Sequence, residues 1–244
     1  MAVGPFPSSL VIVRGMPKAV LFDLDGTLVD SAADLAVSIN EVLAIRSLGP
    51  LPIPSVRRMV GHGIRALVER AHHACNMPLT EDQLDQATSS MQEAYASRLV
   101  QQTSLMPGAT TSIDAAESLG IPLALVTNKP EHFARQILEH FRLLARFEVV
   151  IGGDTGLPRK PEPDMLLLAA RKLGVTRDVS LMVGDGEADI AAACSAGMPS
   201  LLVGTGYNVS GRGPAPSYRM NSLEHFPIWL RERDAINEAR SANF

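Results

Sequence analysis

Residues 19–27 read Ala19-Val20-Leu21-Phe22-Asp23-Leu24-Asp25-Gly26-Thr27, and this stretch decides the fold. Four consecutive apolar residues suit a strand that is buried on both faces of a parallel sheet. Two aspartates and a glycine follow, so the apolar run ends directly in polar turn residues. Because open α/β sheets bind ligands at the carboxyl ends of their strands, the stretch predicts a strand and a binding site together.

Later apolar runs have the same form, and each ends in polar residues or glycine. They span residues 123–126, 147–151, 180–183 and 200–203. Between them lie helical stretches, several of which stop at a glycine such as Gly120 or Gly197, where helices commonly end. Strands that alternate with helices are typical of a doubly wound α/β fold. We therefore predict a parallel-sheet, Rossmann-like core.

One part of the chain breaks this alternation. Leu35, Ile39, Val42 and Leu43 repeat at helical spacing, and a second stripe begins at Ile64. The sequence Thr80-Glu81-Asp82-Gln83 is a capping box that opens a third helix. We predict an all-helical cap domain over residues 30–104, inserted into a discontinuous catalytic core of residues 18–29 and 105–244. Residues 1–17 are expected to form an irregular N-terminal extension.

Composition excludes several classes of protein. The chain has 244 residues, 46% of them hydrophobic, and a net charge of −4, so no basic excess favours nucleic acid or an anionic membrane. No apolar run approaches the roughly 18 residues that a membrane span needs. Two distant cysteines, Cys75 and Cys194, fit a reducing compartment. We expect a cytoplasmic protein, monomer or homodimer, without a membrane or nucleic-acid partner.

Acidic residues gather where the predicted strands end. Asp23 and Asp25 are two apart in an extended segment and point to one side, and Asp185 and Asp189 are four apart where a helix begins. Converging carboxylates repel one another, so this group needs a cation. All-oxygen ligands with room for water favour Mg²⁺. We predict a magnesium site at these four residues.

The neighbouring groups suit a phosphate. Thr127 offers a hydroxyl and Asn128 an amide, directly before a helix whose free N–H groups attract anions. Lys160 adds a compact positive charge. Asn128 serves equally well as a substrate contact or as a helix cap. A carboxylate that attacks phosphorus gives an aspartyl-phosphate, which is a form of covalent catalysis.

The sequence resembles the haloacid dehalogenase superfamily of phosphatases, whose four motifs occur here in order. They are Asp23-Leu24-Asp25-Gly26-Thr27, Thr127-Asn128, Lys160-Pro161-Glu162-Pro163-Asp164 and Gly184-Asp185-Gly186-Glu187-Ala188-Asp189. Further strings are similar to bacterial phosphoglycolate phosphatases, among them residues 125–130, 150–154, 60–63 and 206–208. The resemblance covers residues 19–207 and includes a helical cap after the first motif.

The resemblance implies a role for each motif residue. Asp23 would be the nucleophile and a metal ligand, and Asp25 would act as general acid and base while its backbone carbonyl binds metal. Thr127 and Lys160 would hold the phosphoryl group. Asp185 would complete the metal site, while Asp189 would orient its ligands more than bind the ion. Gly186 stands where the family often has serine, which removes one hydroxyl near the metal.

The resemblance also suggests where the rest of the substrate lies. His62, between Gly61 and Gly63 in the predicted cap, is a candidate to meet the end of the substrate without phosphate, or to form a structural turn. Arg65, one turn further, is a candidate partner for a substrate carboxylate.

We therefore expect a Mg²⁺-dependent phosphatase for a small phosphate monoester, with 2-phosphoglycolate as the substrate and glycolate as the product. Alternatives are a phosphatase for another small phosphate, such as a sugar phosphate, and a phosphomutase. An alternative of a different class is a non-catalytic, phosphate-responsive signalling module. Receiver domains of that class also combine acidic metal ligands with Thr and Lys, but they are about half as long and lack a helical insertion.

Overall fold

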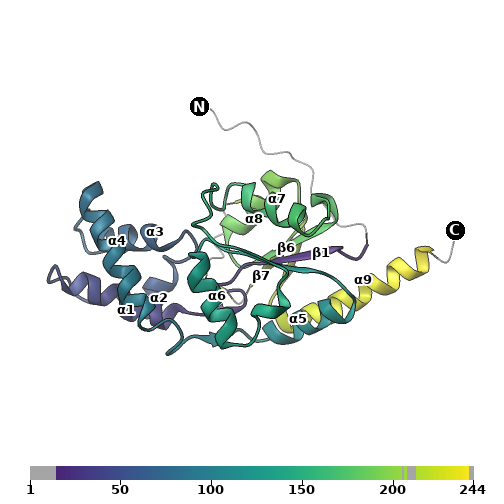
Figure 1. Ribbon diagram of the computed structural model, residues 1–244, viewed down its shortest axis with the longest axis horizontal. Coiled ribbons are helices and arrows are strands. Elements are labelled where there is room, and N and C mark those ends of the chain that lie inside the picture. The colour runs from purple at the N-terminus through teal and green to yellow at the C-terminus, as the bar shows by residue number, and fades with distance from the viewer. Residues whose placement is uncertain (1–14, 205, 208–212, 242–244) are drawn as a thin grey trace.

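A six-stranded parallel sheet runs through the computed structural model, which describes residues 15–204, 206–207 and 213–241 (Figure 1). The strand order is β5-β4-β1-β6-β7-β8. The strands are β1 (Ala19–Phe22), β4 (Leu123–Val126), β5 (Val149–Ile151), β6 (Ser180–Gly184), β7 (Ser200–Val203) and β8 (Tyr218–Met220). The predicted doubly wound α/β core is confirmed. Most of the predicted extension at residues 1–17 lies outside the described residues.

Alternate residues of each strand face opposite layers of helices. Val20 and Phe22 of β1 belong to one apolar core, and Ala19 and Leu21 belong to another. The first core includes α5 (Ala109–Ser118), α6 (Glu131–His140) and α9 (Phe226–Ser241), and the second includes α7 (Asp164–Lys172) and α8 (Glu187–Ala196). Figure 1 shows α7 and α8 on one side of the sheet and α5 and α9 on the other. Burial on both faces explains why the strands read as unbroken apolar runs.

Four helices form a group at one end of the sheet, here called the four-helix region (Figure 1). They are α1 (Ala32–Ala44), α2 (Ile53–Arg57), α3 (Ile64–Ala74) and α4 (Glu81–Ala96). The predicted capping box is confirmed, because the Thr80 hydroxyl accepts the Gln83 N–H while the Gln83 side chain accepts the Thr80 N–H. The boundaries that we set for a separate cap domain stay a prediction.

Two short strands join the four-helix region to the sheet. The strand β2 (Val29–Asp30) pairs antiparallel with β3 (Ser104–Leu105), where the chain enters and leaves the region. Nearby, the buried Asp34 carboxylate accepts hydrogen bonds from the backbone N–H groups of Gln102 and Thr103. Two residues are too few to show a period, so neither strand could be predicted from the sequence pattern.

The strand β8 was also not foreseen. Its residues Tyr218-Arg219-Met220 mix polar and apolar character, as an edge strand that faces solvent on one side can. In the part of the chain that the structure describes, no helix combines the length and apolarity that a bilayer crossing requires.

Candidate active site

The strand order brings the four motifs to one edge of the sheet. Strand β1 lies between β4 and β6, so the segments that follow these three strands are neighbours at their carboxyl ends. Gly26 turns the chain after β1 with φ of +89°, and a Cβ there would lie 2.5 Å from the Asp185 Oδ2 atom. The turn therefore needs glycine both for its backbone angle and for the close approach of Asp185.

Three carboxylates form a buried acidic cluster at this edge. Oxygens of Asp23, Asp185 and Asp189 all lie within 4.8 Å of one another. Burial raises the pKa of Asp23 to about 7, a shift that Lys160 opposes and Asp189 reinforces. The pKa of Asp185 is likewise raised, first by burial and then by the other two carboxylates. The protein thus holds several oxygen donors together at an electrostatic cost.

Lys160 is the cation that holds two of these carboxylates. Its Nζ donates to Asp23 Oδ1, Asp189 Oδ1 and the Val126 carbonyl, each at 2.7 Å. One ammonium beside three carboxylates leaves a negative excess. Hard oxygen donors with excess negative charge are what a divalent cation such as Mg²⁺ prefers, so the residues present fit the predicted metal.

The carboxylate oxygens of Asp185 and Asp189 accept hydrogen bonds from different partners. Asp189 Oδ2 accepts the Gly186 N–H at 3.0 Å, so both Asp189 oxygens are engaged by the protein. Asp185 Oδ2 accepts the Tyr207 N–H at 2.5 Å, and the Thr27 hydroxyl lies 3.4 Å from Oδ1. This pattern supports an orienting role for Asp189, while direct binding of metal by either residue stays a prediction.

Asp25 has a different environment from Asp23, although only Leu24 separates them. Lys129 Nζ donates to both Asp25 oxygens at 2.8 Å, and the Ser31 hydroxyl donates to Oδ1 at 2.5 Å. The Asp25 side chain is therefore not part of the acidic cluster. The two neighbouring carboxylates therefore have separate lysine partners, Lys160 for Asp23 and Lys129 for Asp25.

Lys129 was missed by the sequence analysis. Its side chain is 3% exposed and its Nζ lies 4.7 Å from the centre of the Tyr95 ring of α4. Burial alone would lower the pKa of Lys129, but the Asp25 carboxylate and Tyr95 raise it above its ordinary value. The available signal was its position: it directly follows Thr127 and Asn128, the polar pair that ends an apolar strand.

The two predicted phosphate-binding residues after β4 are both buried, but their side chains have different hydrogen-bond partners. Thr127 lies beside Asp23 and Asp25 in the lining of one cavity, and its hydroxyl oxygen accepts the Lys129 N–H at 3.2 Å. The Asn128 amide is fully engaged: Nδ2 donates to the carbonyls of Gly61 and Lys160, and Oδ1 accepts the Lys160 N–H. Asn128 thus ties the loop before α3 to the motif that carries Lys160.

Two cavities adjoin Asp23. The small cavity, of about 30 Å³, is lined by residues of the sheet edge and by an apolar wall from the four-helix region: Asp23, Asp25, Leu35, Val60, Gly61, Gly63, Ile64, Leu67, Thr127, Asn128 and Lys129. The large cavity, of about 260 Å³, is lined by the acidic cluster and by three basic residues, Arg58, His62 and Arg70, among others: Asp23, Arg58, Gly61, His62, Arg70, Asp185, Gly186, Glu187, Ala188 and Asp189. Asp23 therefore borders both cavities.

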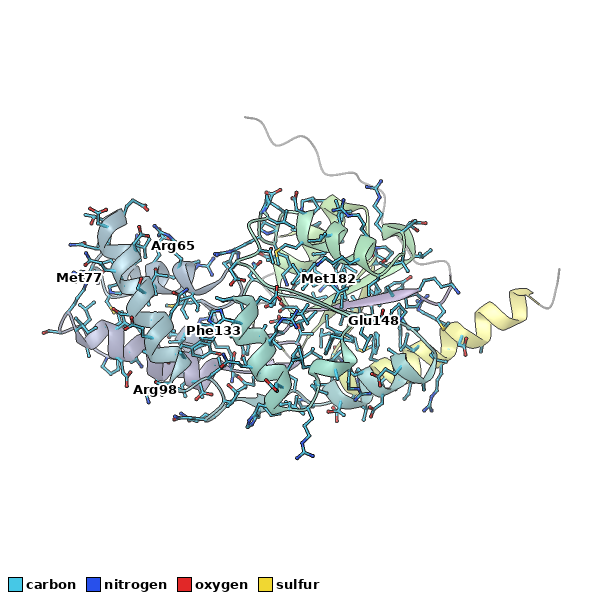
Figure 2. All side chains as sticks on the ribbon, viewed as in Figure 1. Arg65, Met77, Arg98, Phe133, Glu148 and Met182 are labelled. Carbon is cyan, nitrogen blue, oxygen red and sulfur yellow. The ribbon has the colours of Figure 1, made fainter. Side chains whose placement is uncertain are left out.

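The structure separates the two cap residues that the sequence analysis proposed as substrate contacts. His62 lines the large cavity, as the acidic cluster also does. Arg65 lines neither cavity: its guanidinium pairs with Glu81 at 2.6 Å and with Asp85 at 2.9 Å, across the surface of α3 and α4. Figure 2 shows Arg65 on the four-helix region, away from Met182 in the sheet. The structure thus does not bring Arg65 to the site.

Known proteins of one family match most of the chain. The family model described as haloacid dehalogenase-like hydrolase matches residues 17–197. The chain is 42% identical over 197 residues to a phosphoglycolate phosphatase of Rhodospirillum rubrum, covering 79% of this chain and 82% of that protein. It is 38% identical over 216 residues to a phosphoglycolate phosphatase of Xanthomonas campestris, covering 88% and 96%.

A solved structure is similar over the same range. A crystal structure of a predicted phosphoglycolate phosphatase from Haemophilus somnus superposes with a TM-score of 0.77 at 31% identity, covering 85% of this chain and 95% of that one. Both the core and the four-helix region therefore have counterparts among known proteins.

Proposed function

The chain belongs to the haloacid dehalogenase-like hydrolases and is a hydrolase of phosphoric monoesters, and from this premise we propose that it is a Mg²⁺-dependent phosphatase of 2-phosphoglycolate. The observation that carries the proposal is the pair Asp23 and Asp25: one carboxylate lies in the acidic cluster with Lys160, and the other is held apart by Lys129. In the proposal, Asp23 attacks phosphorus and Asp25 transfers a proton.

Asp23 is the nucleophile in this proposal. One of its oxygens attacks phosphorus, the bond from phosphorus to the leaving oxygen breaks, and an aspartyl-phosphate forms. Lys160, bound to Asp23, neutralises charge on the phosphoryl oxygens, and the Thr127 hydroxyl donates to one of them.

Asp25 transfers the protons. As a carboxylic acid it protonates the leaving alkoxide, and as a carboxylate it then takes a proton from the water that attacks phosphorus and releases Asp23. Ser31 and Lys129 hold its carboxyl group at the border of the small cavity, where the leaving oxygen would lie.

Mg²⁺ would be held by the carboxylates of Asp23 and Asp185 and by the Asp25 backbone carbonyl, with Asp189 orienting the site. When bound, the cation supplies positive charge that stabilises the phosphoryl oxygens in the transition state. The raised pKa of Asp185 has the same origin as this affinity, since buried carboxylates near one another favour a positive partner.

The size of the small cavity supports a small leaving group. At about 30 Å³, with room for only a few water molecules, it is much the smaller of the two cavities that adjoin Asp23. The similar proteins from Rhodospirillum rubrum and Xanthomonas campestris bear the name phosphoglycolate phosphatase, which supports 2-phosphoglycolate in particular. His62 is proposed to contact the substrate from the large cavity.

The test is phosphate release from a panel of small phosphate esters, with Mg²⁺ and after chelation. We expect multiple turnovers with Mg²⁺ and the highest kcat/KM for 2-phosphoglycolate. A higher kcat/KM for a sugar phosphate would contradict the substrate. A single equivalent of phosphate per protein would contradict turnover and favour a signalling module. Transfer of phosphate between two positions of a sugar would favour a mutase.

A further inference from the structure

We propose that Lys129 is the specificity residue of this enzyme and binds the carboxylate of its substrate in the small cavity. The inference rests on the proposed function and deepens it, because it assigns recognition of the leaving group to a residue of the sheet edge. The substrate class that it implies is a phosphate monoester with a carboxylate one carbon from the ester oxygen.

The small cavity is lined by residues of two regions. Asp23 and Thr127 belong to the sheet edge, where the phosphoryl group is attacked in the proposed function, and Leu35, Ile64 and Leu67 come from the four-helix region. Lys129 lines the same cavity, and its ammonium contacts Asp25, the proposed donor to the leaving oxygen. A group attached to that oxygen would therefore lie next to the Lys129 ammonium.

Lys129 carries the only positive charge among the residues that line this cavity, all of which the structure describes. Both N–H groups of the Asn128 amide already donate to backbone carbonyls, so it has no free donor for an anionic ligand. Arg65 pairs with two acids on the outer surface. An anionic leaving group in this apolar enclosure would need a charged partner, and Lys129 is in the position to provide it.

Lys129 can hold Asp25 and a second carboxylate together. The Lys129 ammonium has three N–H donors, and Asp25 accepts two of them, which leaves one for a second carboxylate. Lys160 in the same site shows that one ammonium can bind two carboxylates, since it donates to Asp23 and Asp189. Tyr95 lies against Lys129 from α4 and limits where its chain can move. The ammonium is therefore fixed in the cavity wall, which lowers the entropy lost on binding a ligand.

The rival interpretation is that Lys129 only positions Asp25. A pure positioning residue would affect all substrates with equally basic leaving oxygens alike. A carboxylate-binding residue would affect only substrates that carry the carboxylate. 2-Phosphoglycolate and 2-hydroxyethyl phosphate separate the two, since both leave as a primary alkoxide and differ in the group at the second carbon.

The first experiment measures kcat/KM of wild type and Lys129→Met for these two substrates. Wild type is expected to prefer 2-phosphoglycolate, and Lys129→Met to lose that preference by roughly 10- to 100-fold, the size of a charge-assisted hydrogen bond. Lys172→Met, an exposed lysine in the last turn of α7, is the matched control and should keep the preference. Equal losses on both substrates in Lys129→Met would overturn the inference.

A second experiment measures binding instead of catalysis. It is done in an Asp25→Asn background, so that removing Lys129 does not leave the buried Asp25 carboxylate without a partner. Asp25→Asn and the double variant Asp25→Asn/Lys129→Met are compared by calorimetry for binding of 3-phosphonopropionate and of propylphosphonate, which lacks the carboxylate. Asp25→Asn should favour 3-phosphonopropionate by about tenfold or more, and the double variant should bind both alike. The same preference in both variants would overturn the inference.

These outcomes keep the inference distinct from the proposed function. A wild type that hydrolyses 2-hydroxyethyl phosphate at least as well as 2-phosphoglycolate contradicts the proposed substrate, and the inference with it. A wild type that prefers 2-phosphoglycolate while Lys129→Met keeps that preference contradicts the inference alone.

Discussion

The sheet edge and the four-helix region hold charge in opposite ways. At the edge, Lys129 and Lys160 are almost fully buried and each pairs with buried aspartates. In the four-helix region, Arg65 is 37% exposed and its partner Glu81 is 86% exposed. Surface pairs of the second kind contribute little to stability, whereas buried charges cost free energy unless well paired.

The comparison shows where the chain keeps charged groups that lower its stability. Replacing the buried charges of the edge with apolar residues would remove a desolvation cost, so their presence needs a functional reason. The exposed ion pairs of the four-helix region need no such reason. We therefore expect large effects on activity from single residues at the edge and small ones from the exposed charged residues on the helices.

The largest effect is expected at Asp23. Asp23→Asn removes the nucleophile and a carboxylate of the acidic cluster, and should lower kcat by about 10⁴-fold or more, as loss of a covalent nucleophile does in other enzymes. Asp82→Asn, at an exposed aspartate in the first turn of α4, is the matched control and should be unchanged. Steady-state phosphate release measures this loss. More than a few per cent of wild-type activity in Asp23→Asn would disprove a covalent role for Asp23.

Asp25→Asn should have the next largest effect. Loss of a general acid and base lowers rates by about 10²–10⁴-fold, and the loss should be greatest for alkyl phosphates, whose leaving oxygen most needs a proton. For an aryl phosphate with an acidic phenol, the rate of forming the aspartyl-phosphate should fall less, because the phenolate leaves without needing a proton. Rates for both substrates test this, and a loss under tenfold for the alkyl phosphate would refute the assignment.

The metal-free acidic cluster should make stability depend on pH. The pKa of Asp23 is about 7 in the folded chain against an ordinary 3.8. Its contribution to the free energy of unfolding is therefore complete below about pH 4, falls as pH rises towards 7 and is constant above it, with a slope of at most about 1.4 kcal/mol per pH unit.

Melting temperatures in a chelator from pH 4 to pH 8 measure this dependence. Wild type should lose stability relative to Asp23→Asn over that interval, and Mg²⁺ should stabilise wild type more at pH 8 than at pH 5, because protons compete for the same oxygens. Parallel curves for the two proteins would show that Asp23 does not titrate in this range.

The smallest effect is expected at Arg65. Arg65→Ala breaks two surface ion pairs, which are worth about 0–1 kcal/mol each, and should change kcat/KM for 2-phosphoglycolate by less than about twofold. A selective loss for 2-phosphoglycolate, with an aryl phosphate unaffected, would instead support the sequence-based expectation that Arg65 binds the substrate carboxylate.

The same contrast explains what could be predicted from sequence. Asp23, Thr127 and Asp185 follow apolar strands, and parallel strands place their carboxyl ends at one edge, so their meeting follows from local pattern and fold class. Lys160 was predicted as a site residue from its motif and from its position after a predicted strand. The helix ends at Gly120 and Gly197 were also predictable, because glycine commonly ends helices. The structure agrees, since both residues have φ near +65°.

What could not be predicted depends on contacts between distant segments. The Lys129–Asp25 pair joins residues 104 positions apart, and the Asn128–Gly61 bond joins residues 67 apart. Arg65 was expected near the substrate because it lies about one helical turn beyond His62. Its actual direction is set by Glu81 and Asp85 on α4, whose packing against α3 carries no local signal.

The central claim is that Asp23 and Asp25 divide nucleophile and proton transfer between them. The most direct measurement is rapid acid quenching during turnover of 2-phosphoglycolate with Mg²⁺, followed by peptide mass spectrometry and treatment with hydroxylamine, which cleaves acyl phosphates. The account predicts a hydroxylamine-sensitive phosphoryl group on the peptide that contains Asp23, and none in Asp23→Asn. Turnover without any such adduct, or an adduct on a different residue, would contradict it.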